Sequence, residues 1–508
     1  MLQNDDMLPV PLEKRTWKWW NFVTFWLADA WNVNTWTIAS TMIAAGLSWW
    51  QAWTAVWIGY SIAACFMVLN GHAGSKYHCS FPVLTRATFG IWGSLWPILN
   101  RALMACVWYS VQGWIGGQCV YLLIQSIWPS FSSLPNMIPS SGTDSAHFLS
   151  FAIFSLVSLI PIYFPIHQIR HFFTIKARSL SSLFPFSAVV APTAGTAFFI
   201  WFVVKAGGVG TILQQPARAE GKQLQWAFIN AAMGCISNMV TLITNNQDFS
   251  ARADKTSSMI LPQLIALPMT FGMVSFFGII VSSSSNVLYG HQIWDPLELL
   301  ERVLTGSPTI PSRVAVGVIS LSFTFSQMGT NVAANSVSAG CDMAALFPRF
   351  INIRRGSYIA AVLGFCMMPW ELLDGPTNFS TYLSAYSVFL SSMIGCLLAE
   401  YYVVSKRLIT VKDLYVADSS GIYYYFHGVN WRAYLAYFSG LALNMPGFVG
   451  MIQGQMGISV RIYQLSFFTG LGSSFIVYII LNRLFPTRKS TIEEAQSPIT
   501  RKIIDEKA

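Results

Sequence analysis

The stretch LIALPMTFGMVSFFGIIV, residues 264–281, contains no Asp, Glu, Lys or Arg and reads as a helix that crosses a membrane. A hydrocarbon layer about 30 Å thick needs about 20 mainly apolar residues in an α-helix. Largely apolar blocks of comparable length recur at Phe22–Ala45, Leu183–Val204 and Leu465–Leu481. Backbone inside lipid must satisfy its own hydrogen bonds, and these blocks are far too long for barrel strands. The spans are therefore predicted to be helices.

The composition excludes a water-soluble domain. The chain has 508 residues, of which 54% are hydrophobic and 10% are charged, whereas soluble domains carry about 25% charged residues. The net charge of +9 does not indicate nucleic-acid binding, because the basic residues lie in short gaps between apolar blocks. The eight cysteines form no CxxC pair, so they predict packing residues rather than disulfides or a metal site.

Apolar blocks between helix breakers predict an all-α membrane protein with about twelve transmembrane helices. We place their centres near residues 33, 60, 110, 156, 194, 236, 272, 326, 364, 388, 441 and 473. The predicted organisation is a cytoplasmic tail over residues 1–20, a transmembrane domain of twelve helices over 21–482 and a second cytoplasmic tail over 483–508. With this count, most of the 30 Lys and Arg residues fall on the side of both termini. The positive-inside rule then predicts cytoplasmic termini in a multi-pass protein of the plasma membrane. The N-terminus is polar, and no cleavable signal peptide is expected.

Polar residues interrupt two of the predicted helices. In the first, Asp29, Asn32 and Asn34 lie close together, and such side chains compete for backbone hydrogen bonds. They predict a discontinuous helix whose freed carbonyls and amides face an ion or a substrate. The alternative is hydrogen bonding between helices. The helix centred near residue 236 contains Gly234 and Asn238, and it predicts a second interrupted helix.

Two further pairs of polar residues share helix faces. Trp108 and Gln112 are four residues apart, and so are Asn331 and Asn335. An indole offers a flat stacking surface, and a carboxamide offers a donor beside an acceptor, which suits a planar ring edged with N–H and C=O groups. Packing within the bundle is the alternative for both pairs.

Few charged residues fall within the predicted spans, and Asp29, Arg101 and Asp342 are the deepest. Each either forms a structural ion pair or caps a helix end, and Asp29 alternatively titrates during a proton-coupled cycle.

Three long segments resemble the nucleobase-cation-symport-1 family, and within it the fungal uracil and allantoin permeases. They are RTWKWWNFVTFWLADAWNVNTWTIAS at 15–40, FPVLTRATFGIWGSLWPILNRALMACVWYSVQGWIGGQCV at 81–120 and GTNVAANSVSAGCDMAALFPRFINIRRG at 329–356. The similarity runs from about Asn4 to the end of the last predicted helix. It implies a five-plus-five inverted repeat, like the bacterial leucine and hydantoin transporters, with two additional C-terminal helices. It also implies alternating access and, in the fungal branch, proton symport.

The resemblance also implies a substrate site. Trp108 would stack on the substrate ring, Gln112 would hydrogen-bond its edge, and Asn335 would supply a second amide. Asn34 and Tyr382 would lie close by.

The sequence departs from the family pattern at three places. The consecutive hydroxyl residues that bind sodium in a bacterial member match Gly329 and Thr330, which favours protons over sodium. Asp29, Thr330 and Asp342 are then the candidates for cation or proton coupling. A second stacking Trp of the hydantoin transporter matches Cys235, which predicts stacking on one side only. In the family, an Arg follows the helix that is centred here near residue 236. In this sequence that Arg is displaced by one residue, to Arg252.

These observations predict a secondary active transporter that imports uracil or allantoin together with protons. Uric acid is a further candidate substrate. Uridine and thiamine are alternative substrates, although cationic thiamine would favour an acidic site that the sequence does not offer. A membrane receptor or sensor that kept the pocket is the alternative from another class. No enzyme, cofactor, resident metal or nucleic-acid partner is expected; the partners are the heterocycle and the lipid bilayer. Tail lysines such as Lys489 are either ubiquitin acceptors or solvated residues of the positive-inside pattern.

Overall fold

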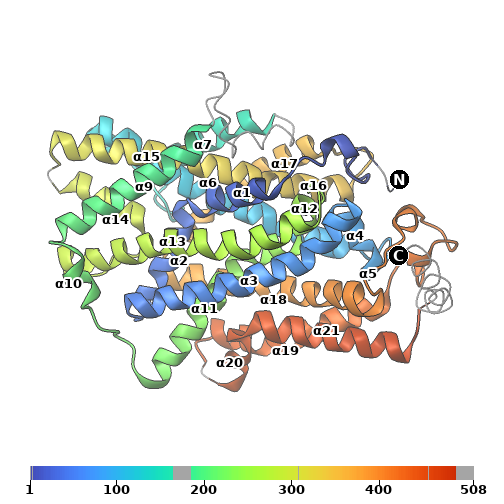
Figure 1. The fold of residues 1–508 in the computed structure, drawn as a ribbon. Helices are drawn as coiled ribbons and strands as arrows, with labels where there is room; N and C mark the ends of the chain where they lie inside the picture. Colours follow the sequence, from blue (N-terminus) through green and yellow to red (C-terminus); the bar gives the residue numbers. More distant parts are fainter. Residues whose placement is uncertain (1, 3, 164–184, 307, 456, 488–508) are drawn as a thin grey trace.

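The computed structural model describes residues 2, 4–163, 185–306, 308–455 and 457–487, and within them the chain is a bundle of helices without β-strands (Figure 1). The helices of 18 or more residues are α3 (Trp49–Tyr77), α6 (Leu95–Ile127), α7 (Ser145–Ile162), α9 (Pro185–Lys205), α11 (Gly221–Thr244), α13 (Ser257–Tyr289), α15 (Ile310–Thr330), α18 (Pro376–Leu398), α19 (Trp431–Ile452) and α21 (Ser466–Leu484). The all-α architecture predicted from the apolar blocks is confirmed.

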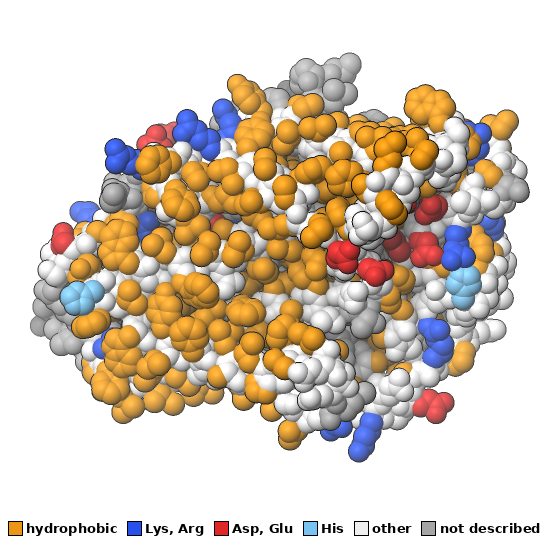
Figure 2. All heavy atoms as spheres, turned by 180° about the vertical axis from the view of Figure 1, so that it is seen from behind, with side chains coloured by type: hydrophobic (Ala, Val, Ile, Leu, Met, Phe, Trp, Pro, Cys, Tyr) orange, Lys and Arg blue, Asp and Glu red, His pale blue; other side chains and the backbone are white. Residues whose placement is uncertain are grey.

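Seven helices within the described residues are long and apolar enough to cross a membrane. Each of the twelve predicted centres lies within a helix. The number of spans stays a prediction, because α17 (Ile353–Phe365) has only 13 residues, too few to cross a bilayer alone. Apolar side chains cover a broad face of the molecule (Figure 2). Such a surface is unsuited to water and well matched to lipid tails.

The first predicted span is broken, as the polar residues predicted. It consists of α1 (Trp19–Ala30) and α2 (Val33–Ala44), and the extended residue Asn32 caps α2 by accepting a 3.0 Å hydrogen bond from the Thr35 amide. The hydroxyl of Ser326 donates to the Trp31 carbonyl, one of the acceptors that the break releases. The break is therefore held by side chains from its own flank and from α15.

The prediction of a break at Gly234 is wrong. Helix α11 is continuous through this glycine, because one glycine costs only about 1 kcal/mol within a helix. The helix ends instead at Asn245, where the polar run continues into the short α12 (Asn246–Ser250).

A different interruption lies in the span centred near residue 326. Between α15 and α16 (Val337–Leu346), residues Asn331–Ser336 form a π-helix, which is wider than an α-helix. Single-turn π segments are frequent at functional sites.

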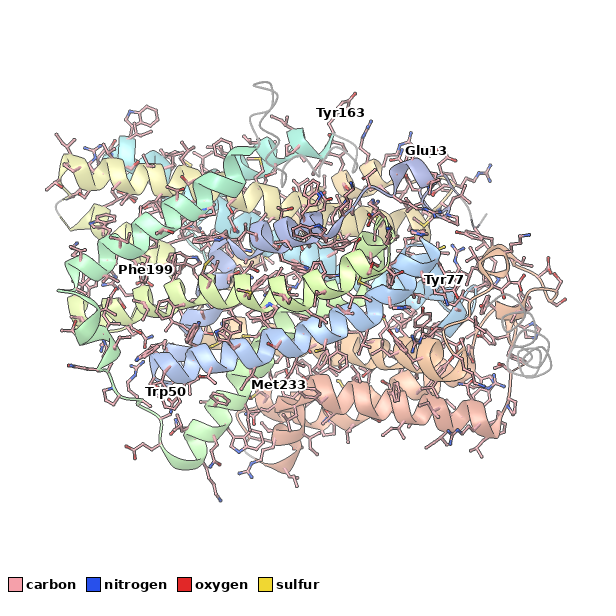
Figure 3. All side chains as sticks on the ribbon, in the orientation of Figure 1. Glu13, Trp50, Tyr77, Tyr163, Phe199 and Met233 are labelled. Atoms are coloured by element: carbon pink, nitrogen blue, oxygen red, sulfur yellow. The ribbon has the colours of Figure 1, made fainter. Side chains whose placement is uncertain are left out.

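The described N-terminal segment packs on one end of the bundle, which we call the N-terminal end. Trp17 pairs with Ala253, and the Tyr415 hydroxyl donates to the Met7 carbonyl at 2.7 Å. Glu13 and Tyr77 mark this end in Figure 3, and Trp50 marks the opposite end, where α10 (Val209–Leu213) and α14 (Pro296–Thr305) lie.

Basic residues predicted for the cytoplasmic side lie at the N-terminal end. One example is Lys76, whose ammonium donates to the Arg407 carbonyl at 2.8 Å. Eight residues predicted for that side lie outside the described residues; they are Arg170, Lys176, Arg178, Arg488, Lys489, Arg501, Lys502 and Lys507.

Candidate functional site

The predicted site residue Gln112 belongs to an amide bridge near the middle of the bundle. Gln112 is buried on α6, and its Oε1 accepts a 2.6 Å hydrogen bond from the amide of Gln327 on α15. The Gln327 Oε1 in turn accepts from the Val33 amide at 3.3 Å, at the start of α2. Gln327 therefore joins three helices at the break. Gln327 was not among the predicted site residues, although its position one turn before Asn331 was a usable signal.

The predicted pair Asn331 and Asn335 is confirmed as one face. The Nδ2 of Asn335 donates to Asn331 Oδ1 at 3.0 Å, and Asn331 Nδ2 donates to the Tyr109 carbonyl at 3.0 Å. Asn331 is completely buried, whereas Asn335 is half-buried. Asn331 therefore links Asn335 to α6, and the link reaches α6 at Tyr109, the residue after Trp108.

Asn34 lies in a second chain of amides. Its Nδ2 donates to Asn238 Oδ1 at 3.3 Å, and Asn238 Nδ2 donates to the Tyr60 hydroxyl at 3.3 Å. The Oδ1 of Asn34 is buried and has no hydrogen-bond partner among the described residues. A buried acceptor of this kind is costly unless something binds it.

Aromatic residues of α18 surround Trp108. The rings of Trp108 and Tyr382 lie 5.8 Å apart at 58°, and those of Trp108 and Tyr386 lie 6.1 Å apart at 84°. The Tyr382 hydroxyl is buried without a partner in the described part of the chain. Cys235 does not lie opposite Trp108, because its Cβ packs against Gly59 of α3. Stacking on one side only stays a prediction, and the rings of Tyr382 and Tyr386 are the aromatic groups of α18 that lie beside Trp108.

The coupling candidates fall into two places. Asp29 is buried in the last turn of α1, next to the break, and its carbonyl accepts from the Asn32 amide. Thr330 is buried at the end of α15, directly before the π-helix. Asp342 instead forms a buried ion pair with Arg101 on α6.

The structure thus places Asp342 away from the other site residues. Arg101 precedes Trp108 by seven residues on α6, about 10 Å along the helix toward the N-terminal end. Arg252, whose role the family pattern left open, donates to the backbone carbonyl of Asp248.

Two cavities approach the mid-bundle residues from opposite ends. One of about 380 Å³ reaches Val33 and Thr37 from the end where α14 lies, and its wall carries tryptophans and carboxylates, namely Trp114, Trp294, Trp370, Asp144, Asp295, Glu371 and Asp374. Figure 2 shows acidic side chains gathered in a hollow on that end. The other cavity, of about 410 Å³, reaches Val332 and Ser336 from the N-terminal end. A polar centre between two opposed cavities is the geometry that alternating access needs.

Comparisons with known proteins agree with this geometry. Residues 9–470 match the family model described as permease for cytosine/purines, uracil, thiamine and allantoin. The chain is 46% identical to an uncharacterized permease of Schizosaccharomyces pombe, over 96% of this chain and 80% of that one. It is 41% identical to the allantoin permease and 39% identical to the uracil permease of Saccharomyces cerevisiae, over 96% of this chain and 76% of each relative.

Among solved structures, the chain resembles Mhp1, a nucleobase-cation-symport-1 transporter, in a closed conformation with bromovinylhydantoin bound. The TM-score is 0.75 at 21% identity, covering 97% of this chain and all of Mhp1. An inward-facing structure of Mhp1 gives a TM-score of 0.74. These matches establish the five-plus-five inverted-repeat fold with additional C-terminal helices. The protein is a nucleobase-type transporter, not an enzyme, and the chain belongs to the nucleobase-cation-symport-1 family of permeases.

Proposed function

We propose that the protein imports an uncharged planar heterocycle, allantoin or uracil in preference to uridine or thiamine, in symport with protons. The observation that carries this proposal is the buried indole of Trp108 together with two oriented carboxamides. Gln112 lies on the same helix and is bound by Gln327, and Asn335 on the π-helix is tied to α6 through Asn331. The relatives named allantoin permease and uracil permease support the same choice.

The amides suit a ring edge that alternates N–H and C=O groups. A carboxamide donates and accepts at neighbouring atoms, so it pairs with an amide edge of the ring. The bonds from Gln327 to Gln112 and from Asn335 to Asn331 orient these groups before a substrate arrives. Orientation in advance lowers the entropy cost of binding. Thiamine is disfavoured, because Trp108, Gln112 and Asn335 offer no carboxylate to pair with its positive charge.

Proton coupling is supported by what surrounds the break in the first span. The Trp31 carbonyl at the break accepts from the Ser326 hydroxyl, so this freed acceptor is already satisfied by a side chain. Asp342 forms a salt bridge with Arg101, so Asp29 is the better candidate for carrying the proton. We expect Asp29→Asn to remove the dependence of uptake on a proton gradient while exchange of labelled for unlabelled substrate continues. Uptake by Asp29→Asn that still follows the gradient would contradict this role.

The proposed cycle is alternating access at the plasma membrane, with both termini in the cytoplasm. The basic residues at the N-terminal end support this orientation through the positive-inside rule. Rocking of α1, α2, α3, α11 and α13 against the other helices would close the cavity at the α14 end and open the one at the N-terminal end.

Uptake into sealed vesicles, with and without an inward proton gradient, tests the function. Unlabelled uracil, allantoin, uric acid, uridine and thiamine compete against labelled uracil or allantoin. Gln112→Ala and Asn335→Ala should lose uptake at normal surface expression. Gln125→Ala, which removes a buried amide farther along α6, is the matched control. Undiminished uptake in the first two variants would refute the site, and binding without accumulation would favour a receptor.

A further inference from the structure

A separate cavity of about 260 Å³ lies between α2, α11, α18 and the C-terminal helices α19 and α20 (Ile458–Gln464). In Figure 3, Met233, one of its lining residues, lies on α11 beside the C-terminal helices. The cavity involves none of the residues assigned to the site around Trp108.

The cavity lies toward the α14 end relative to those residues. On α2, Ile38 and Thr41 follow Asn34 by one and two turns, and on α11 Gly234 precedes Asn238 by one turn. The outer ends of these two helices meet, because the Arg218 amide donates to the Gly46 carbonyl at 2.9 Å. A molecule in this cavity is therefore one helical turn from the amide chain of Asn34.

The lining is mainly apolar with several polar groups, and its described residues include no Asp, Glu, Lys, Arg or His. It combines hydroxyls and amides with small and apolar side chains; the polar members are Thr41, Asn230, Thr381, Ser384, Tyr463 and Gln464. This separates it from the 380 Å³ cavity, whose wall carries four carboxylates. An uncharged ligand with several hydrogen-bonding groups fits such a lining best.

Two observations indicate that the cavity is built to be filled. Tyr463 is only 1% exposed, yet its hydroxyl finds no hydrogen-bond partner within the described residues. Leaving a buried hydroxyl unpaired is unfavourable, and a ligand with a carbonyl or an N–H group would remove that cost. On the facing helix, a Cβ added at Gly234 would meet no atom within 4 Å, so the backbone of α11 borders open space.

We propose that this cavity is a second substrate site, where an uncharged planar heterocycle binds on its way to Trp108. Pockets for drug-sized molecules measure about 300–1,000 Å³, so a volume of about 260 Å³ suits a smaller, single-ring molecule. We call it the outer site. The proposal rests on the proposed function, since it assigns the same class of substrate to both sites.

Filling the outer site tests the proposal directly. Gly234→Leu directs an isobutyl group into the space beside α11, where an added Cβ meets no atom within 4 Å, and it raises helix propensity, so the variant should fold. Gly472→Leu in α21 is the matched control, because a Cβ at Gly472 also meets no atom within 4 Å. We expect equilibrium binding of radiolabelled uracil or allantoin to give two molecules per wild-type chain and per Gly472→Leu chain. Gly234→Leu and Trp108→Ala should each bind one.

The outcomes separate the two proposals. If none of uracil, allantoin, uric acid, uridine and thiamine binds the wild-type chain, the proposed function is wrong and the outer site is wrong as well. If the wild-type chain binds one molecule and Gly234→Leu leaves that binding unchanged, the outer site alone is overturned. Tyr463→Phe should weaken binding in the Trp108→Ala background by about threefold to tenfold, as expected for one lost hydrogen bond. Unchanged affinity there would remove Tyr463 from the site.

Discussion

Among single residues, Gln327 on α15 connects three helices, because its one amide group bonds to α6 and to α2 at once. It donates to Gln112 at 2.6 Å and accepts from the amide of Val33 at 3.3 Å, while being completely buried. Gln327→Met keeps the length of the side chain but removes both bonds. Each bond contributes about 0.5–1.5 kcal/mol. We therefore expect transport efficiency to fall by about tenfold or more, measured as initial uptake rate over substrate concentration.

The control for Gln327→Met is Gln125→Met, which removes a buried amide from α6 outside the site. If both variants transported equally well, the bridge would have no role in positioning Gln112.

A second residue-level prediction concerns Asp295, which precedes α14 and lines the 380 Å³ cavity. Burial raises the pKa of this carboxyl to about 6, while the Leu297 amide that it caps at 2.9 Å acts to lower it. The folded chain then holds this proton more tightly than the unfolded chain. Its contribution to stability is present below about pH 4 and is lost as the pH rises through 6.

Asp295→Asn keeps an acceptor for the cap and removes the titration. We expect the Tm of the purified wild-type protein, relative to that of Asp295→Asn, to fall between pH 4 and pH 7. Parallel Tm curves for the two proteins over this range would contradict the assignment. Asp418→Asn, which changes an exposed carboxyl, serves as the control.

On the scale of elements, the break between α1 and α2 depends on Asn32. Its Oδ1 accepts from the Thr35 amide at 3.0 Å, and its Nδ2 donates to the Asp29 carbonyl. Asn32→Ala removes the cap, which costs about 1 kcal/mol, and favours a continuous helix through the break. Asn32→Ser retains a capping oxygen. We expect Asn32→Ala to lower both the Tm and the uptake rate more than Asn32→Ser does, and equal effects would show that the cap is unimportant.

The elements also show which parts of the fold a sequence reveals. Apolar blocks revealed the helices, and the cluster of Asp29, Asn32 and Asn34 revealed the break, because both are local patterns. The π-helix at Asn331–Ser336 was not predictable, since its residues have no local composition that distinguishes it from an α-helix. Gly234 was misread for a related reason. Whether a glycine bends a helix depends on the neighbours that tertiary packing brings.

For the candidate site, the sequence showed which polar residues share a helix face. It did not show which of these faces contact one another. Trp108 and Tyr382 lie 5.8 Å apart and tilted, whereas a flat ring stacked between two others needs roughly 7 Å, two contacts of about 3.5 Å. A substrate that stacks between them must therefore displace the Tyr382 ring. No spacing of residues along the chain reports such a distance.

At the scale of the whole molecule, alternating access requires an N-terminal end that closes and opens. The buried pair of Arg101 and Asp342 lies there, joining α6 to α16. The Asn245 amide donates both to Asp248 Oδ2 at 3.1 Å and to the Ser338 hydroxyl at 2.9 Å. These bonds connect the end of α11, in the group proposed to rock, to α16 in the other group. The cluster is thus placed to hold this end closed.

Removing the guanidinium of Arg101 should therefore lower the free energy of unfolding of the whole protein. Arg101→Met leaves the carboxylates of Asp342 and Asp248 buried near each other, and we expect a loss of about 3–5 kcal/mol in stability. Arg101→Met/Asp342→Leu replaces the pair with apolar groups and should recover much of that loss, because the cost of burying the unpaired Asp342 charge disappears. Chemical unfolding of the purified proteins measures both. If the double variant were as unstable as the sum of its single variants, the pair would not act as a unit, and closure would depend on the bonds of Asn245 instead.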